Sequence, residues 1–548
     1  MRHNFCSELV TGLVFCGALI AATAAPDTER AVAVNPNGRL IYTPDAFGNT
    51  VPDFSLAGYR HGGVELPVAP VRETLQPQAG AKDDAARIQE ALDRVSRLEP
   101  RPEDGVRGAV LLARGTYHCA RSLRVPPGVT LRGEGSSTNG TVIISTRTPA
   151  SPGEKPRLIE MGGVPSRLAL GQGHRVLDQA VPLGARRLRV ENAGAFSPGD
   201  VVLIERRPDA TWIHDLRMDQ IADLRAGGQQ WKAEGYVRRW QARVRESTGD
   251  TLSLDTPIIC ALERKYDVST VRKITADGRG RAAAVERLRL LSVYAPGRET
   301  SDEAHAWDAI VVNNVVDSWV REVTALHFAN SCVTVASAAA RITVQDCAML
   351  DPVSQITGGR RYSFVGSGQF VLFQRCYARN GRHDFVTGSG DMGPTVFLDC
   401  LAEQTHADIG PHHRWACGQL YDNIKGRQIH AQDRGRSGSG HGWAGNAQVF
   451  WNCEAESFVC QKAWIPSAQN WNLGGVGKRG KPALPDRPDG WWESFGRHVE
   501  PRSLYLAQLR ERLAAEGEDA EAALVKVTAP QQRSGTVWEL LRNRHRTD

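Results

Sequence analysis

VLFQRC at residues 371–376 and TVFLDC at residues 395–400 decide the fold of this chain, because similar strings flank them. ITVQDC at 342–347 and QVFWNC at 448–453 have the same form, a short β-branched or aromatic strand that ends in a polar residue and a cysteine. The four cysteines are 29, 24 and 53 residues apart, and the last gap is about two periods. A period of roughly 20–30 residues that holds only strands and turns is typical of a parallel β-helix, in which stacked coils share one core.

The side chains at the end of each repeat predict how a coil is built. We expect Cys347, Cys376, Cys400 and Cys453 to point inward as a buried ladder of small side chains, without disulfides. The residues just before them then face outward as a structural salt ladder: Asp346, Arg375, Asp399 and Asn452. A β-sandwich would show hairpin signals between its strands, and these are few. The predicted fold class is therefore all-β, a single-stranded right-handed parallel β-helix.

The segment before the repeats carries a family resemblance. It reads DFSLAGYRHGGVELP (53–67), then DDAARIQEALDRVSRL (83–98), then GAVLLARGTYHCARSLRVPPGVTLRGEGSSTNGTVI (108–143). This order of extended segment, amphipathic helix and strand pair resembles the N-terminal part of secreted proteins of the pectate lyase superfamily. The resemblance implies the β-helix fold and a polysaccharide lyase or glycoside hydrolase activity, although one fold hosts many reactions. Uronate lyases of that superfamily often use Ca²⁺ with a lysine or arginine base.

The rest of the chain divides around the coils. Arg2 and His3, the apolar run Leu9–Ala22 and the small residues of Ala22-Thr23-Ala24 predict a signal peptide over 1–24, hence a secreted or periplasmic bacterial protein. An N-terminal extended segment follows over 25–80, and the β-helix is expected over 81–470. A charged excursion with a helical stretch is expected at about 206–245. A C-terminal extension over 471–548 is expected to contain a capping helix.

Composition narrows the partners. The net charge is +6, with the excess mostly arginine, and an exported chain without lysine-rich tracts is a poor match for nucleic acid. Guanidinium groups pair well with carboxylate or sulfate, so the expected partner is an acidic polysaccharide. No membrane insertion is expected after signal cleavage. The sequence lacks a CxxC pair, a GxSxG elbow, a P-loop and HExxH, which argues against structural zinc, serine hydrolase, nucleotide-binding and zincin classes.

The candidate site comes from THADIGPHHRWACGQLYDNI at 405–424 and from RNGRHDF in the preceding coil. Counted from Cys376 and Cys400, Asp384 and Asp408 fall at the same position of neighbouring coils. Stacked strands lie about 4.8 Å apart, so two such carboxylates would form an acid/base pair or hold a cation. The alternative is that they cap turns. Whether the site binds Ca²⁺ is therefore left open, and no residues are assigned as metal ligands.

For a lyase, the residues take distinct predicted roles. Arg414 or Arg382 would neutralise the uronate carboxylate, and His412, His413 or His383 would act as the base. Tyr421 would protonate the leaving oxygen. Gly410-Pro411 argues against a regular strand and predicts that the histidine pair is presented from a loop. The expected substrate-binding residues are Arg382, His406, Asp422, Asn423 and His441, the last in the glycine-rich stretch SGSGHGWAGN (437–446).

Three alternatives remain open from the sequence. Glycoside hydrolysis or transglycosylation would use paired carboxylates among Asp384, Asp399 and Asp408, with a separation of roughly 5–9.5 Å. Asp408–His412 also loosely resembles the Asp-Pro-His motif of alginate C5-epimerases, which abstract the same proton. The third alternative is a non-catalytic β-helix adhesin or carbohydrate-binding protein.

Overall fold

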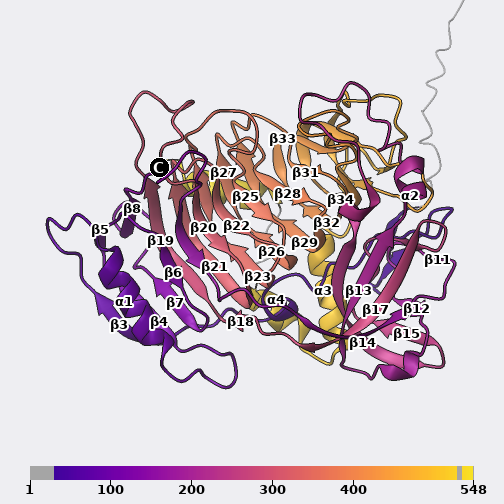
Figure 1. The fold of residues 1–548 in the computed structure, drawn as a ribbon, viewed down its shortest axis with the longest axis horizontal. Coiled ribbons are helices and arrows are strands. Elements are labelled where there is room, and N and C mark those ends of the chain that lie inside the picture. Colours follow the sequence, from indigo (N-terminus) through magenta and orange to yellow (C-terminus); the bar gives the residue numbers. More distant parts are fainter. Residues whose placement is uncertain (1–29, 528–533, 547–548) are drawn as a thin grey trace, which may run out of the picture.

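The chain winds into a right-handed parallel β-helix whose coils have three faces (Figure 1). The computed structural model describes residues 30–527 and 534–546, so the predicted signal peptide lies outside the described residues. No helix in the described part of the chain is long and apolar enough to cross a membrane.

The first two faces belong to one 21-stranded sheet, in which β19 and β21 bend and contribute to both faces. The first face contains β3 (Val71–Leu75), β4 (Gly108–Leu112), β7 (Val129–Arg132), β19 (Ala284–Ser292), β21 (Val315–Leu326), β23 (Ala340–Gln345), β26 (Gln369–Gln374), β29 (Met392–Leu398), β32 (Ala416–Asp422), β34 (Gly445–Trp451), β36 (Trp471–Leu473) and β38 (Trp491–Glu493). The second face adds β5 (Gly115–Cys119), β8 (Thr141–Ser145), β24 (Ala348–Leu350), β27 (Tyr377–Arg379), β30 (Leu401–Glu403), β33 (Lys425–Ala431), β35 (Glu454–Cys460) and β37 (Val476–Arg479). The short β18 (Gly280–Arg281) also pairs with β21.

The third face is a separate seven-stranded parallel sheet with β31 as its last strand. In stacking order it contains β6 (Leu123–Val125), β9 (Arg157–Met161), β20 (Asp308–Val312), β22 (Ser331–Val335), β25 (Phe364–Gly366), β28 (Phe385–Ser389) and β31 (Gly410–His413).

The core inside the coils confirms the predicted cysteine ladder. Cys347, Cys376, Cys400 and Cys453 are fully buried in one hydrophobic cluster, and the structure contains them as free thiols. Aromatic rings stack beside them in the same register, with 4.9 Å between the ring centroids of Phe373 and Phe397 and 5.2 Å between those of Phe397 and Tyr421. Such stacks add to the burial of each ring and fix the alignment of neighbouring coils.

The predicted salt ladder is also present on the outside of the coils. Arg375 donates two hydrogen bonds to Asp346 at 2.9 and 2.8 Å, and Arg502 contacts Asp399 at 2.7 and 3.1 Å. Asn452 binds the backbone of Val499. Asp399 is therefore tied to a C-terminal arginine, and we leave it out of the candidate site.

Helices cover two of the three outer faces. Leu504 and Leu509 of α3 (Leu504–Ala515) pack on the first face together with α4 (Ala520–Val527), and Trp538 of α5 (Ser534–Arg544) packs on the second. The N-terminal hairpin of β1 (Val32–Val34) and β2 (Leu40–Tyr42) joins the cover of the first face. The predicted helix over 83–98 is α1 (Ala85–Ser96), which packs on the first coils. Among residues 30–527 and 534–546, no helix covers the third face in this way.

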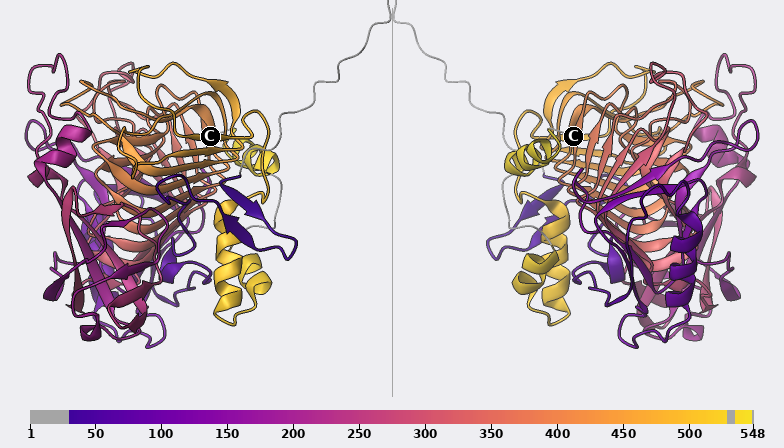
Figure 2. Two further views of the ribbon diagram at one scale, coloured as in Figure 1. Left: turned by 90° about the vertical axis from the view of Figure 1, so that its right-hand side faces the viewer. Right: turned by 90° about the vertical axis from the view of Figure 1, so that its left-hand side faces the viewer.

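The excursion expected at about 206–245 belongs to a larger unit with little helix. Antiparallel strands form its main sheet: β10 (Ala169–Arg175), β17 (Asp267–Ala276), β13 (Val201–Pro208), β14 (Arg238–Thr248), β15 (Thr251–Leu254) and β12 (Arg187–Arg189). A small pair consists of β11 (Ala180–Val181) and β16 (Leu262–Glu263), and α2 (Ala210–Asp215) has six residues. The charged run in β14 alternates between buried and exposed side chains, which is strand rather than helix periodicity. We call this part, residues 169–276, the inserted unit. Figure 2 shows it and the C-terminal helices on opposite sides of the coils.

Candidate active site

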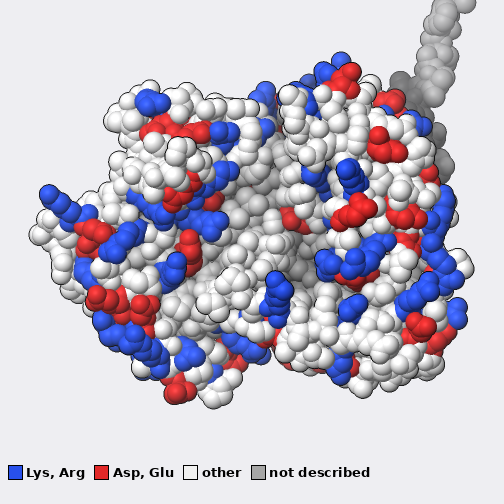
Figure 3. All heavy atoms as spheres, in the orientation of Figure 1, with Lys and Arg blue, Asp and Glu red and all other residues white. Residues whose placement is uncertain are grey.

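The uncovered third face is the floor of a cleft. Ile310 of β20 and Val333 of β22 point into the core. Because side chains alternate along a strand, the next residues, Val311 and Thr334, point outward, and they pair with each other across the two strands. Figure 3 shows a hollow in the molecular surface over these strands, with lysine and arginine side chains on both sides of it. One wall is β14 of the inserted unit. Together with the turns after β22, β25 and β28 it encloses a cavity of about 580 Å³, a size that suits a small-molecule site.

Four histidines gather where the cleft reaches β31. His412 and His413 lie on β31, His383 lies in the turn before β28, and His441 comes from the loop before β34. The ring centroid of His412 lies 4.6 Å from that of His383, 5.0 Å from that of His413 and 5.0 Å from that of His441. The rings of His413 and His441 are 4.7 Å apart. We call these four residues the histidine cluster.

Tyr362, from the turn before β25, packs against the histidine cluster. Its hydroxyl lies 3.0 Å from Nε2 of His412, and its ring packs edge-on against His383 at 5.1 Å. Burial is the largest cause that raises the pKa of Tyr362, so its hydroxyl keeps its proton at neutral pH. Tyr362 is half-buried, whereas His412 is only 6% exposed. The phenol is therefore the part of this pair that a bound molecule can reach.

Asp408, which lies behind the cluster, fixes the orientation of His383 through its backbone carbonyl. Its Nδ1 lies 2.6 Å from the backbone carbonyl of Asp408, which sets Nδ1 as the protonated nitrogen. The carboxylate of Asp408 accepts a hydrogen bond from Arg434 at 2.9 Å. The Arg434 and His383 side chains hold the pKa of Asp408 below its ordinary value, although burial opposes them. Asp408 is thus an ionised partner of Arg434.

All four imidazoles are neutral at neutral pH. Burial lowers the pKa of His383 to about 4, of His413 to about 4 and of His441 to about 3, and nearby arginines act in the same direction. Burial and His383 also lower the pKa of His412. Neutral imidazoles have a free lone pair, so each can accept a proton.

Several ring nitrogens of the cluster have no partner. Nε2 of His383 and Nδ1 of His412, His413 and His441 are buried and make no hydrogen bond. Buried polar atoms without partners are uncommon and point to a ligand or a functional role. Within residues 30–527 and 534–546, no three His, Cys, Asp or Glu side chains are arranged to hold a metal ion.

The predicted register of Asp384 and Asp408 is confirmed, but the two carboxylates have different surroundings. Strand pairing matches Val386 with Gly410, which is the expected shift of 24 residues. Asp384 is fully buried and accepts a hydrogen bond from Ser363 at 2.6 Å, and burial raises its pKa to about 6. Because it faces the protein interior, we leave Asp384 out of the proposed site.

His412 and His413 lie on a strand and not on a loop. Pro411 pairs with Thr387 of β28 within the parallel sheet. The proline is tolerated because β31 is the terminal strand, where one side of the ladder needs no further donor. The two rings stay in contact, with 5.0 Å between their centroids, and His412 is buried whereas His413 is half-buried.

Three predicted residues at the C-terminal end of the stretch are structural. Tyr421 is fully buried and stacks on Phe397, so it cannot reach a substrate. Asp422 accepts hydrogen bonds from Ser503 at 2.7 Å and from the backbone of Tyr505, and it anchors α3. Asn423 donates to Asp422 at 2.6 Å.

The remaining predicted residues divide between the cluster and the open surface. Arg414 binds Ser439 of the loop that carries His441, at 2.8 Å, beside His413. Arg382 lies over the ring of Tyr362 at 5.9 Å. His406 is exposed and contacts Asn380 at 2.7 Å, outside the cluster.

The sequence did not single out Tyr362, Arg434 or a carboxyl in the cleft wall, Asp391. Asp391 lines the 580 Å³ cavity, and burial raises its pKa to about 6 although Ser367 and Gly388 donate hydrogen bonds to it. Arg238 of β14 lines the same cavity. Asp391 follows a strand of the third face, as Arg414 does one coil later, which is a positional signal once the strands are known.

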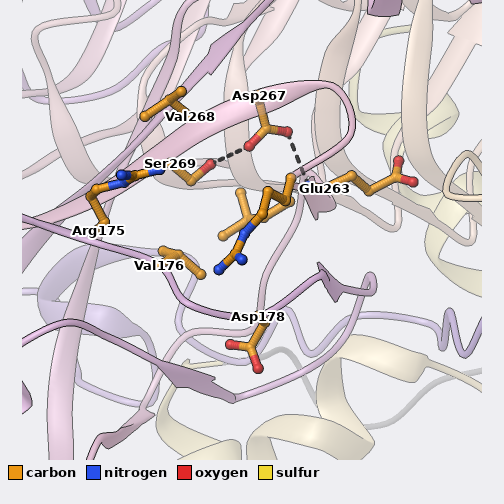
Figure 4. Close-up of a pocket in the computed structure, with 9 residues that line it drawn as sticks. Arg175, Val176, Asp178, Glu263, Asp267, Val268 and Ser269 are labelled. Carbon is orange, nitrogen blue, oxygen red and sulfur yellow. Dashed lines mark hydrogen bonds between the residues drawn. The ribbon is translucent and has the colours of Figure 1, made fainter.

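A second small cavity lies within the inserted unit (Figure 4). Asp267 lines it and accepts hydrogen bonds from Ser269 at 2.6 Å and from the backbone of Glu263 at 3.0 Å. Its volume of about 20 Å³ is room for about one water molecule, so it is too small for a saccharide.

No family model matches the sequence, and no curated protein matches it. Solved structures do match. The tailspike protein gp49 from Pseudomonas phage LKA1 is 14% identical with a TM-score of 0.40, over 72% of this chain and 55% of the tailspike. An alginate lyase from Paenibacillus sp. str. FPU-7 is 11% identical with a TM-score of 0.35, over 78% of this chain and 99% of the lyase. An iota-carrageenase complexed to iota-carrageenan fragments is 10% identical with a TM-score of 0.28, over 76% and 61%.

The chain thus spans little more than half the length of the tailspike. At these low identities, the substrate of each of those proteins is a property of that protein alone and is not assigned to this chain. None of the comparisons places the chain in the pectate lyase superfamily.

Proposed function

We propose that the chain is an exported carbohydrate-active enzyme that cleaves an acidic, uronate-containing polysaccharide by β-elimination. The observation that carries the proposal is the half-buried phenol of Tyr362, hydrogen-bonded to a neutral His412 beside the half-buried His413 and Arg414. β-Elimination needs a base, a proton donor and a group that neutralises the uronate carboxylate, and these four side chains supply them.

Exposure assigns the roles. His383 and His412 are nearly inaccessible, so the proposed base is His413, which takes the proton from the carbon next to the carboxylate. Arg414 or Arg382 pairs with that carboxylate and stabilises the negative charge that develops on it. The electron pair then forms the double bond and expels the glycosidic oxygen, which takes the proton of Tyr362. His413 and Tyr362 return to their resting states by proton exchange with water.

The pKa of His413 fits this role only when substrate is bound. Burial and Arg414 hold it at about 4, so the free enzyme has an unprotonated base throughout the neutral range. A uronate carboxylate that pairs with Arg414 offsets the cationic charge that disfavours imidazolium. The basicity of His413 therefore rises on binding. Tyr362 stays protonated because its own pKa is raised.

The experiment is turnover of a panel of polysaccharides, namely pectate, alginate, glycosaminoglycans and ulvan, followed by the ultraviolet absorbance of unsaturated uronate ends. The wild-type protein is expected to produce the absorbance on one of them. His413→Gln should abolish it, while the matched control His406→Gln should keep it because His406 lies outside the cluster. Equal, mild losses in both variants would contradict the assigned base.

Glycoside hydrolysis is the second candidate, and Asp391 favours it. A carboxyl whose pKa is raised to about 6 in a cleft of this size suits a general acid. Asp391 is the one carboxyl among the residues that line this cavity, whereas hydrolysis needs two. Reducing ends without ultraviolet absorbance would favour hydrolysis. Solvent-deuterium incorporation without new ends would favour epimerisation, and binding without turnover a carbohydrate-binding protein.

A further inference from the structure

A third cavity, of about 520 Å³, lies where the inserted unit meets the N-terminal segment and the first coils. Five arginines line it, and we call it the arginine cavity: Arg60, Arg243, Arg279, Arg281 and Arg341. It shares the lining residues Gln241 and Arg279 with the cleft cavity that holds Asp391, so the two cavities are neighbours. The histidine cluster lies beyond the opposite end of that cleft cavity, next to Ser389, which pairs with His413.

The arginine cavity has an excess of positive charge. Asp317 pairs with Arg341 through two hydrogen bonds at 2.7 and 3.1 Å, and Asp277 pairs with Arg279 at 2.9 and 2.7 Å. These are the two carboxylates of the lining. Among the described residues, no carboxylate forms an ion pair with the other three arginines: Arg60, Arg243 and Arg281. Unpaired guanidinium groups around a cavity attract and bind anions.

An unusual turn presents one of these arginines. Arg60 and His61 have φ angles of 48° and 70°, in the left-handed region that non-glycine residues seldom adopt. The next residue, Gly62, also has a positive φ, and a Cβ there would lie 2.6 Å from the carbonyl oxygen of Ala57. Arg512 secures the turn through hydrogen bonds to the carbonyls of His61 and Gly62 at 3.0 and 3.2 Å. Two strained residues in a row cost stability, and such strain gathers at functional sites.

His61 adds a second observation that points to a ligand. Its Nδ1 is buried and has no hydrogen-bond partner, although the residue lines the cavity. Burial and Arg341 lower the pKa of His61 to about 3, so the ring is neutral and does not add to the charge. The rings of His61 and Phe370 make a T-shaped contact with 4.9 Å between their centroids, which fixes the orientation of the imidazole. A ligand polar group would satisfy the open nitrogen.

We propose that the arginine cavity binds an anionic sugar unit, bearing a carboxylate or a sulfate, of the same saccharide chain that lies in the cleft. That the ligand is a saccharide rests on the proposed function, whereas the anion selectivity rests on the charges of the cavity. Arg243 and Arg281 contact the anionic group, and Arg60 closes the cavity from the N-terminal turn. The site is remote from the histidine cluster, so it contributes affinity for longer chains and no chemistry.

The test measures binding by calorimetry in the full-length mature protein with Tyr362→Phe, in which the proposed role of Tyr362 predicts turnover slowed by about 10²–10⁴-fold. Oligogalacturonate is the carboxylate probe, an iota-carrageenan oligosaccharide is the sulfate probe and a cello-oligosaccharide is the neutral control. Arg243→Gln and Arg281→Gln are each expected to weaken binding of one anionic probe about three- to tenfold, and less so in high salt. Arg245→Gln is the matched control, because Arg245 lies on the same strand, faces Glu516 at 3.8 Å and does not line the cavity. It should bind like the parent.

The outcomes separate this proposal from the proposed function. If neither anionic probe binds more tightly than the neutral one, or if the cavity variants bind as Arg245→Gln does, the arginine cavity is not an anion site. If the cavity variants lose affinity while the protein with Tyr362 intact turns over no polysaccharide of the panel, the anion site stands and the enzymatic proposal fails. The two probes also decide between carboxylate and sulfate.

Discussion

Replacing Tyr362 by phenylalanine separates chemistry from packing at the histidine cluster. The change removes one oxygen atom and keeps the ring that packs against His383 at 5.1 Å and His412 at 5.3 Å. What is lost is the hydroxyl's 3.0 Å hydrogen bond with Nε2 of His412, its longer 3.4 Å hydrogen bond to the carbonyl of Gly358 and, in the proposed reaction, the proton for the leaving oxygen.

The two losses have different expected sizes. A positioned acid contributes typically about 10²–10⁴-fold to the rate, so kcat should fall by that factor, with little change in KM because the phenol does not bind the carboxylate. Leaving His412 without its partner costs about 1–3 kcal/mol of stability. A cost of this size moves Tm by only a few degrees in a chain this long, since about 1 kcal/mol shifts a 150–250-residue domain by about 2–4 °C.

The assay follows the ultraviolet absorbance of unsaturated ends under saturating substrate, together with thermal unfolding. Tyr377→Phe is the matched control, because it likewise removes a phenolic hydroxyl with a side-chain hydrogen bond, to Glu403 at 2.9 Å, but on the second face. It should lose similar stability and keep its kcat. A kcat of Tyr362→Phe within the range of that control would show that Tyr362 is not the proton donor.

Three further predictions test packing, pH dependence and the alternative chemistry. Phe397→Ala, which removes a ring stacked at 4.9 and 5.2 Å between two others, should lower the free energy of unfolding by about 3–5 kcal/mol in denaturant titrations, and a loss below 1 kcal/mol would contradict the stacked core. The pKa of His383 is lowered from 6.5 to about 4, so the unfolded chain binds more protons between these values. At pH values below about 4 this difference makes the folded state about 3 kcal/mol less stable than at pH 7. His383→Gln should remove that part of the loss of stability on acidification. An unchanged pH profile would instead place the pKa of His383 in the folded protein near 6.5. Asp391→Asn should leave kcat for elimination nearly unchanged, whereas its abolition would move the chemistry to the cleft wall and favour hydrolysis.

The repeats made the coil interior predictable, and turns of variable length hid much of the site. Cys376 and Cys400 give the shift of 24 residues that aligns Asp384 with Asp408, and the strand pairing has the same shift. Between β25 and β28 the shift is 21 residues instead, and Tyr362 lies in the long turn before β25. Its position beside His412 therefore depends on the path of a turn that carries no repeat.

The inserted unit was the other part of the structure that could not be predicted from the sequence. Its charged strand β14 has the composition of an exposed helix, and only its burial alternation identifies it as a strand. Asp391 and Arg238 acquire their setting from this unit, which packs on the turns after the third face. Tyr421 shows the opposite case, in which a residue next to the cluster in sequence points into the core because strand side chains alternate.

The most direct measurement is the product that the wild-type protein releases from the panel of uronate polysaccharides. The proposed geometry of His413, Tyr362 and Arg414 predicts ultraviolet absorbance that rises in step with new reducing ends on one of these polymers. Reducing ends that appear without the absorbance, or no new ends on any polymer, would contradict β-elimination at this site.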